Sequence, residues 1–261
     1  GTVESEDKGA KNGVEGSHAA DVSEGGDSID PGDTSEKDPA EPEPVVLEKP
    51  VIEKGEIQSG GIGISWSEVE GADGYYIHRK ISGKDWEQID VVPGGNAVSY
   101  KDAGVKSGTT YYYRIEAFCS DGDIVSGRSG YKKMVYLLAP VIRAEVRSAG
   151  NQIFWDKAAG AGGYYVYRRE SSVSSWTKLA TLTSGSIRSY YDKKAANGKN
   201  YVYAVRAYKE DSVSLYSAGK SIYRLSPPKV KSWKRKSSTK MTLKWSANSQ
   251  AGGYEIQYAR N

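Results

Sequence analysis

Few residues of this chain have side chains suited to acid–base or nucleophilic chemistry. The sequence holds two histidines, His18 and His78, and a single cysteine, Cys119. A hydrolase needs a nucleophile beside a base or a pair of carboxylates, and a zinc site needs several Cys or His ligands at short spacing. Neither arrangement surrounds these three residues. The sequence therefore predicts that the protein is not an enzyme and holds no metal or cofactor.

Two of these residues belong to segments that alternate between apolar and polar side chains. His78 lies on the polar side of its segment, so we expect it to face solvent. Cys119 lies on the apolar side at the end of another segment, so we expect a small, inert and partly buried thiol, with crosslinking between chains as the alternative. Because Cys119 is the sole cysteine, an intramolecular disulfide is excluded.

Three short motifs lack the surroundings that a functional site requires. The segment GRSG at 127–130 does not have the spacing of a nucleophile elbow, and GGIG at 60–63 precedes a strand pattern instead of a helix. Asp121 and Asp123 could form a weak calcium site, but a turn is favoured because the related segment later in the chain lacks the same pair. None of the three motifs supports hydrolase or nucleotide chemistry.

The best candidate for binding is the basic segment KVKSWKRKSSTK, which begins at Lys229. Its cations could attract cell-wall polymers, glycosaminoglycans or, with the weakest support, nucleic acid. Alternating lysines also protect an exposed strand edge from pairing with a neighbour, so a solvated face without a ligand is the alternative. The candidate contacts with a polyanion are Lys229, Lys231, Lys234, Arg235, Lys236 and Lys240.

Trp86 and Trp176 are a second candidate for binding. An exposed indole ring can serve as a platform on which a sugar ring stacks. The two tryptophans, however, recur 90 residues apart at the same place in two related segments. This recurrence favours a shared packing role, and sugar stacking stays open as the alternative.

An internal repeat predicts the elements that position these residues. Trp66, Trp155 and Trp245 are 89 and 90 residues apart, and the tyrosine that follows each of them repeats the same intervals. Two further tyrosines recur at 90 residues in the first two copies. Each copy is therefore expected to have its own core. The residues expected in these cores are Trp66, Trp155, Trp245, Tyr75, Tyr164, Tyr254, Tyr111, Tyr201, Tyr113 and Tyr203.

Within each copy the apolar residues alternate with polar ones, which is the period of a half-buried β-strand. The run 111–118, for example, places Tyr111, Tyr113 and Ile115 on one face and Arg114 on the other. Seven such runs occur in the first copy, which predicts a Greek-key sandwich. The abundance of Tyr and Gly, with little Phe or Met, also favours an all-β protein.

These features resemble the fibronectin type III modules of large secreted proteins of Gram-positive gut bacteria. The resemblance rests on the tryptophan of the second strand, on the GY pair that follows it in all three copies, and on VKSGTTYYYRIEA and AANGKNYVYAVRA. It implies tandem immunoglobulin-like β-sandwiches, with Tyr111 and Tyr201 as the tyrosine corner, whose hydroxyl bonds a backbone group a few residues upstream. Ser107 and Asn197 depart from the proline that the family has at their position.

The repeat divides the chain into four parts. Residues 1–46 carry 13 acidic and 3 basic residues and no aromatic one, which predicts a disordered acidic linker. Residues 47–137 and 138–225 are expected to form two complete modules, called module 1 and module 2 below. Residues 226–261 are expected to be the N-terminal part of a truncated third module. Because no flexible insert separates the copies, we expect the modules to be joined end to end in a rod.

The resemblance implies non-catalytic extracellular modules, secreted or attached to the cell surface, that space or present another part of a larger protein. The chain begins with Gly, shows no signal peptide and has no apolar stretch that could span a membrane, so we expect a trimmed piece of that protein, and a monomer. Two alternatives stay open. One is an accessory role in a secreted glycan- or wall-degrading hydrolase. The other is an adhesin that binds a host or cell-wall glycan, polyanion or protein; no specific nucleic-acid partner is expected.

Overall fold

The computed structural model describes residues 44–257. Within this range the regular elements are β-strands and one 3-10 turn, Ser120–Gly122, which confirms the predicted all-β class. The strands form two sandwiches of fibronectin type III topology, followed by a hairpin. The acidic linker expected for residues 1–46 lies almost entirely outside the described residues.

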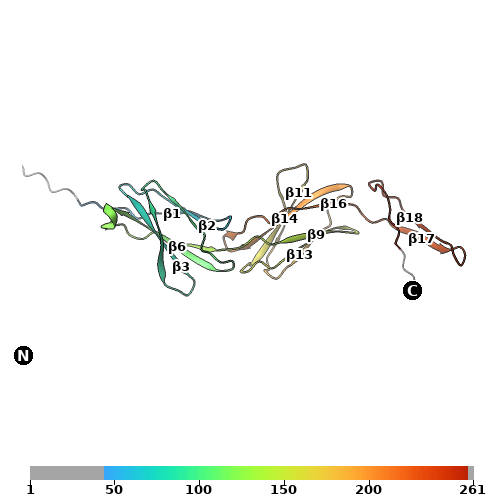
Figure 1. Ribbon diagram of the computed structural model, residues 1–261, viewed down its shortest axis with the longest axis horizontal. Coiled ribbons are helices and arrows are strands. Elements are labelled where there is room, and N and C mark those ends of the chain that lie inside the picture. Colours follow the sequence, from blue (N-terminus) through green and yellow to red (C-terminus); the bar gives the residue numbers. More distant parts are fainter. Residues whose placement is uncertain (1–43, 258–261) are drawn as a thin grey trace, which may run out of the picture. The chain divides into compact units, whose positions relative to one another are not determined.

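Module 1 has a three-stranded sheet and a larger sheet (Figure 1). Apolar side chains from both sheets form its core. The first sheet has the order β1-β2-β5. The second has the order β4-β3-β6, and two short strands, β7 and β8, pair with the free side of β6. All pairs are antiparallel. The strands are β1 Ile52–Gln58, β2 Gly61–Trp66, β3 Gly74–Ile81, β4 Trp86–Pro93, β5 Ser99–Asp102, β6 Thr110–Cys119, β7 Ile124–Val125 and β8 Lys132–Val135.

Module 2 repeats this topology strand for strand. Its first sheet has the order β13-β10-β9, and its second has the order β12-β11-β14 with β15 and β16 on the free side of β14. The strands are β9 Ile142–Arg147, β10 Gly150–Trp155, β11 Gly163–Glu170, β12 Thr177–Leu182, β13 Ser189–Asp192, β14 Lys199–Lys209, β15 Ser212–Val213 and β16 Lys220–Arg224.

The last strand of each module is split in two because serine hydroxyls replace part of the backbone ladder. Between β7 and β8, Ser126 Oγ accepts a hydrogen bond from the Ala117 amide, and Ser129 Oγ accepts one from the Ile115 amide, both at 2.9 Å. These serines are buried, so each hydroxyl satisfies an amide that would otherwise lack an acceptor. Ser129 of the GRSG segment thus has a structural role. The corresponding pairs in module 2 are Ser214 with Ala207 and Ser217 with Val205.

The repeated tryptophan and tyrosine lie at the centre of each module. The rings of Trp66 and Tyr75 meet edge to face with centroids 5.3 Å apart, and those of Trp155 and Tyr164 are 5.4 Å apart. Such aromatic pairs contribute about 0.5–1.5 kcal/mol beyond the area that they bury. The expected core aromatics that the structure buries are Trp66, Tyr75, Tyr111, Tyr113, Trp155, Tyr164, Tyr201 and Tyr203.

The tyrosine of the GY pair also fixes the turn that leads into its strand. Tyr75 Oη accepts a hydrogen bond from the Val69 amide at 3.0 Å and donates one to the Gly95 carbonyl at 2.7 Å. Residue 95 must be glycine, because a Cβ there would collide with the carbonyl oxygen of Ala72. The partners of Tyr164 in module 2 are Ala158 and Gly185. The GY pair recurs because each sandwich needs this turn as well as its own core.

The third copy is described as a hairpin and the turn that follows it. Its strands are β17 Val230–Arg235 and β18 Met241–Trp245. Trp245 and Tyr254 repeat the edge-to-face contact, at 5.4 Å, but Tyr254 is 42% exposed and Trp245 is only partly buried. The expectation that these two residues are buried in a core is therefore wrong over the described residues, because one hairpin surrounds them there without a facing sheet.

Candidate functional site

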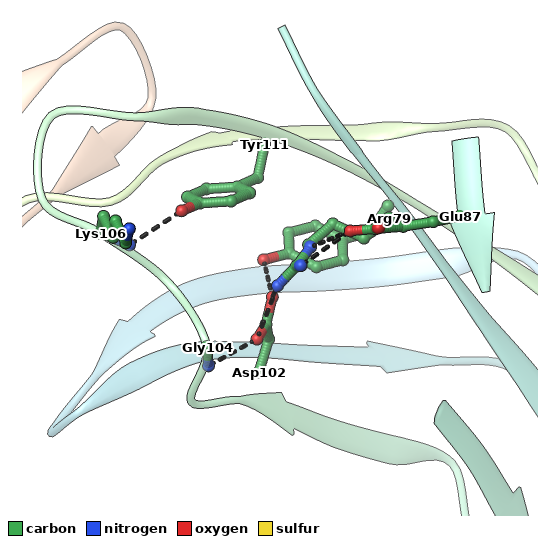
Figure 2. A network of polar contacts seen from close by, with 7 residues as sticks. Arg79, Glu87, Asp102, Gly104, Lys106 and Tyr111 are labelled. Atoms are coloured by element: carbon green, nitrogen blue, oxygen red, sulfur yellow. Dashed lines mark hydrogen bonds and ion pairs between the residues drawn. The ribbon is translucent and has the colours of Figure 1, made fainter. Parts of the chain in front are cut away.

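A buried aspartate on the first sheet of each module accepts hydrogen bonds from two strands of the second sheet. In module 1 the side chain of Asp102, on β5, is 3% exposed. It accepts hydrogen bonds from Arg79 Nη1 of β3 at 3.0 Å, from Tyr113 Oη of β6 at 2.8 Å and from the Gly104 amide (Figure 2). Arg79 also forms an ion pair with Glu87 of β4 at 2.7 Å. One carboxylate thus ties β5 of the first sheet to two strands of the second.

Module 2 repeats this network around Asp192 of β13. The carboxylate accepts hydrogen bonds from Arg168 Nη1 at 2.8 Å, from Tyr203 Oη at 2.7 Å and from the Lys194 amide. Among the described residues, Asp192 is the one carboxylate that pairs with Arg168. Neither network was predicted from the sequence. The signal was present, since the arginines recur at 89 residues and the aspartates at 90, as the core aromatics do.

The network holds its groups in fixed charge states. Burial, together with the nearby aspartate, raises the pKa of the Tyr113 and Tyr203 hydroxyls. Burial alone would lower the pKa of Arg79, but hydrogen bonds to Glu87 and Asp102 outweigh it and raise that pKa. The tyrosines therefore stay neutral and the arginine stays charged around pH 7. Groups that do not exchange protons near neutrality suit a structural contact, not acid–base catalysis.

His78 is buried, so the expectation that it faces solvent is wrong. The residue is 5% exposed although it lies on the outer face of β3. Glu116 of β6 covers it, with Oε2 3.0 Å from His78 Nε2, and Arg128 contacts the same carboxylate. Long side chains on neighbouring strands can cover a residue that alternation assigns to the wet face. Burial and repulsion from Arg128 lower the pKa of His78 despite the opposing contact with Glu116.

The other chemical candidates of the sequence have simpler positions. Cys119 is buried and forms no disulfide. The side chain of Asp121 lies outside the described residues, so its pairing with Asp123 is not placed. Within residues 44–257, no cluster of three or more His, Cys, Asp or Glu side chains is arranged to hold a metal ion. The same range contains no helix with the length and hydropathy that a membrane span requires.

The six basic candidates are exposed and surround the β17–β18 hairpin. They do not share one face. Lys234 and Arg235 are consecutive residues of β17, and consecutive strand side chains point to opposite faces. Along the hairpin, Lys229 precedes β17, Lys231, Lys234 and Arg235 lie within it, and Lys236 and Lys240 lie at the turn.

The outer face of the larger sheet of module 1 carries an aromatic groove. Trp86 of β4 lies against Arg114 of β6, whose guanidinium carbon is 4.6 Å from the ring centroid. Tyr112 of β6 and Tyr131 meet edge to face at 5.5 Å. Together with Lys80 of β3 they line a cavity of about 350 Å³. Trp86 is half-buried and Tyr131 is 59% exposed, so the groove is open to solvent.

On the corresponding face of module 2, the aromatic residues stack on one another. Trp176 and Tyr216 are nearly parallel, with centroids 5.6 Å apart. Arg169 lies 5.2 Å from the Trp176 centroid and Arg206 lies 4.7 Å from that of Tyr216. Trp86 and Trp176 thus differ in their surroundings although they recur at the same place in the repeat.

The tyrosine corner anchors the turn before the longest strand of each module. Tyr111 Oη accepts a hydrogen bond from the Lys106 amide at 2.8 Å, and Figure 2 shows this contact beside the Asp102 network. Tyr201 Oη accepts one from the Ala196 amide at 3.1 Å. Both hydroxyls make the upstream backbone contact that the resemblance implies.

The two residues that depart from the family pattern hold the segment that leaves each module. Ser107 Oγ accepts a hydrogen bond from the Leu138 amide at 3.1 Å, and Asn197 Oδ1 accepts one from the Ser226 amide at 2.7 Å. A proline side chain has no acceptor and could make neither contact. Each departure therefore forms an anchor between the turn before β6 or β14 and the connection to the next copy.

Comparison with known proteins finds matches among solved structures alone. No family model matches the chain, and no curated protein does. A two-domain fibronectin type III segment of chicken tenascin is 14% identical, with a TM-score of 0.37, and the match covers 68% of this chain and 98% of that one. The FN1–FN3 domains of chicken CNTN1 are 17% identical, with a TM-score of 0.36 and 69% of each chain covered. An Fn3-like protein from Clostridium thermocellum is 27% identical, with a TM-score of 0.31, over 35% of this chain and 96% of that one.

Proposed function

We propose that the two modules are non-catalytic spacers that present another part of a larger secreted or surface-attached protein outside the cell. The extracellular location comes from the family resemblance of the sequence. The spacing role has its own support in the anchored connections, and that role can be tested on the chain itself.

The observation that carries the proposal is the side-chain anchor at each connection. Ser107 and Asn197 stand at the same place in the two modules, and each accepts a hydrogen bond from the first amide beyond its module. A side-chain hydrogen bond to a connecting segment removes freedom that the segment would otherwise have. A spacer needs such restriction, because a connection that bends freely does not hold what it carries at a defined distance.

The spacing role is tested by distance measurement between spin labels in the full chain. Labels are attached at Lys84→Cys and Lys193→Cys, both exposed positions, in a Cys119→Ala background. We expect a narrow distribution of distances between modules 1 and 2, which Ser107→Ala broadens. Asn197→Ala is the matched control, since it releases the second connection and leaves the first intact. A distribution that is already broad in the parent chain, or that Ser107→Ala leaves unchanged, contradicts the proposal.

The extracellular location has a separate test. When intact cells that express the whole protein are treated with a protease, the modules should be cleaved while cytosolic proteins survive. Full protection of the modules would contradict the location without affecting the spacing role.

Adhesion to an anionic polymer is a second candidate, favoured by the exposure of all six basic side chains of the β17–β18 hairpin. Contacts of this kind are electrostatic and weaken as salt rises. We expect the full chain to be retained on heparin or teichoic acid at low salt. Replacement of the six residues by Gln should weaken retention, and unchanged retention would remove this candidate.

A further inference from the structure

We propose that the groove on module 1 is a binding site for an acidic glycan, an oligosaccharide whose sugar rings carry carboxylates. The site goes beyond the spacing role, and neither depends on the other. The groove is lined by Lys80, Ser82, Trp86, Tyr112, Arg114 and Tyr131.

The lining side chains form a row that runs across the strands. Lys80 of β3 is opposite Trp86 of β4 on one side and opposite Tyr112 of β6 on the other. Directly opposite residues of antiparallel strands lie on the same face. Since neighbouring strands are about 4.8 Å apart, Trp86 and Tyr112 stand about 10 Å apart, with a lysine between them. The row therefore suits an extended ligand that lies across the sheet.

The groove is locally positive and has an unsatisfied donor. Its lining includes Lys80 and Arg114 and no Asp or Glu. Arg114 Nε is buried and has no hydrogen-bond partner among the described residues. A guanidinium that stacks by its face on an indole presents its N–H groups at its edge, in the fork geometry that fits a carboxylate. A buried donor without a partner is costly, so a carboxylate that draws the Arg114 side chain out to meet it gains by binding here.

The remaining lining matches a sugar better than a peptide or a nucleic acid. An oligomer of uronate-type rings offers carboxylates to Arg114, apolar C–H faces to the aromatic side chains and hydroxyls to the two phenols along its length. A peptide that adds as a strand needs a free sheet edge, whereas this groove crosses the strands. Nucleic acid is drawn by a broadly basic surface, whereas residues 47–137 contain 11 Lys and Arg against 13 Asp and Glu.

Module 2 shows which substitutions can remove the site from module 1 without disturbing the fold. Val202 and Ala204 of β14 stand where β6 has Tyr112 and Arg114. The sandwich of module 2 accommodates both small residues, and its tryptophan, Trp176, stacks on a tyrosine instead. The double variant Tyr112→Val with Arg114→Ala therefore copies a pair of residues that this fold already tolerates at these positions.

The site is tested with a galacturonic-acid oligomer and its carboxyl-reduced, neutral counterpart. Each is titrated into the full chain by calorimetry, while NMR follows the Nε–Hε signal of Arg114. We expect saturable binding of the acidic oligomer, a shift of the Arg114 signal on binding, and an affinity for the neutral oligomer that is lower by about tenfold or more.

Two variants complete the test. Tyr112→Val with Arg114→Ala should weaken binding of the acidic oligomer by about tenfold or more. Arg128→Ala removes an exposed arginine of the same module that does not line the groove, and should change the affinity by less than about twofold. A circular dichroism melt of each variant confirms that module 1 stays folded, so that a loss of affinity is a loss of the site.

Several results would overturn the proposal. They are no saturable binding of the acidic oligomer, equal affinity for the neutral one, or an affinity that the double variant does not change. Binding of oligoglutamate or of single-stranded oligothymidylate with equal or higher affinity, and with the same shift of the Arg114 signal, would assign the groove to a peptide or a nucleic acid instead.

Discussion

Asp102 binds an arginine and a tyrosine inside module 1, and Asp192 binds their counterparts inside module 2. On the outer face of the same sheets, Arg114 of module 1 lines an open groove, whereas module 2 has Ala204 and a stacked aromatic pair in that region. A buried charge that loses its partner destabilises the fold strongly, whereas a partly exposed side chain outside the core can change at lower cost. The contrast separates the residues that the sandwich requires from those that are free to acquire a ligand.

The two modules also differ in net charge. Residues 47–137 carry 11 Lys and Arg against 13 Asp and Glu, and residues 138–225 carry 14 against 6. The charge of a whole module acts on distant ions, whereas contact with a ligand depends on a few side chains. Module 2 should therefore attract polyanions at long range, while module 1 depends on its groove.

The stability of each module can be measured separately within the intact chain. A urea titration followed through the methyl NMR signals of Ile115 and Val205 reports the unfolding of module 1 and module 2, because both side chains are fully buried.

The largest effect is expected from removal of the central aspartates. Asp192→Ala should destabilise module 2 by about 3–5 kcal/mol, because it leaves a partly buried arginine without a carboxylate. Asp102→Ala should cost module 1 less, since Arg79 keeps its contact with Glu87. Asp85→Ala, at an exposed loop position, is the control. A loss below about 1 kcal/mol in both modules would show that the networks are dispensable.

A smaller effect, equal in the two modules, is expected when a serine whose hydroxyl replaces a backbone acceptor is changed to alanine. Ser129→Ala leaves the Ile115 amide without its acceptor, and Ser217→Ala does the same to the Val205 amide. Each change should cost its own module about 1–3 kcal/mol. Ser99→Ala, at an exposed position on β5, should have little effect. Unequal losses would mean that the two split strands are not equivalent.

The smallest effect is expected from a change of pH, which should alter the stability of module 1 alone. The folded state lowers the pKa of His78 below its ordinary value of 6.5. The neutral imidazole therefore contributes stability that is present above about pH 6.5 and is lost as the pH falls through the folded pKa. His78→Tyr, which copies Tyr167 of module 2, should remove this dependence. If the urea midpoint of module 1 falls equally in the variant, another group is responsible.

The repeat of aromatic residues was enough to predict both cores and the sandwich topology, because Trp66 and Tyr75 are apolar, periodic and recur at fixed intervals. Alternation could not reveal the network of Asp102, since a charged residue on a strand is read as exposed until its partner on another strand is known. His78 was misplaced for the same reason, because Glu116, which covers it, lies 38 residues away.

The groove could not be predicted either. Its lining comes from β3, β4, β6 and the segment before β8, which lie side by side only after the sheet forms. Tyr254 shows which part of a prediction depends on neighbouring residues. Its contact with Trp245 is local in sequence and forms as in the two modules. Its burial would need strands distant in sequence, and the residue is exposed.

The β17–β18 hairpin has a practical consequence for handling the protein. Trp233 and Leu243 are paired on one face of it, and Trp233 is 69% exposed. An exposed apolar face of this kind tends to associate with the same face of another molecule. The cations around the hairpin oppose that association, because they repel those of the second molecule. Molar salt shortens the reach of this repulsion to about 3 Å. Solutions of the chain should therefore keep best at low ionic strength, with salting-out beginning at this hairpin.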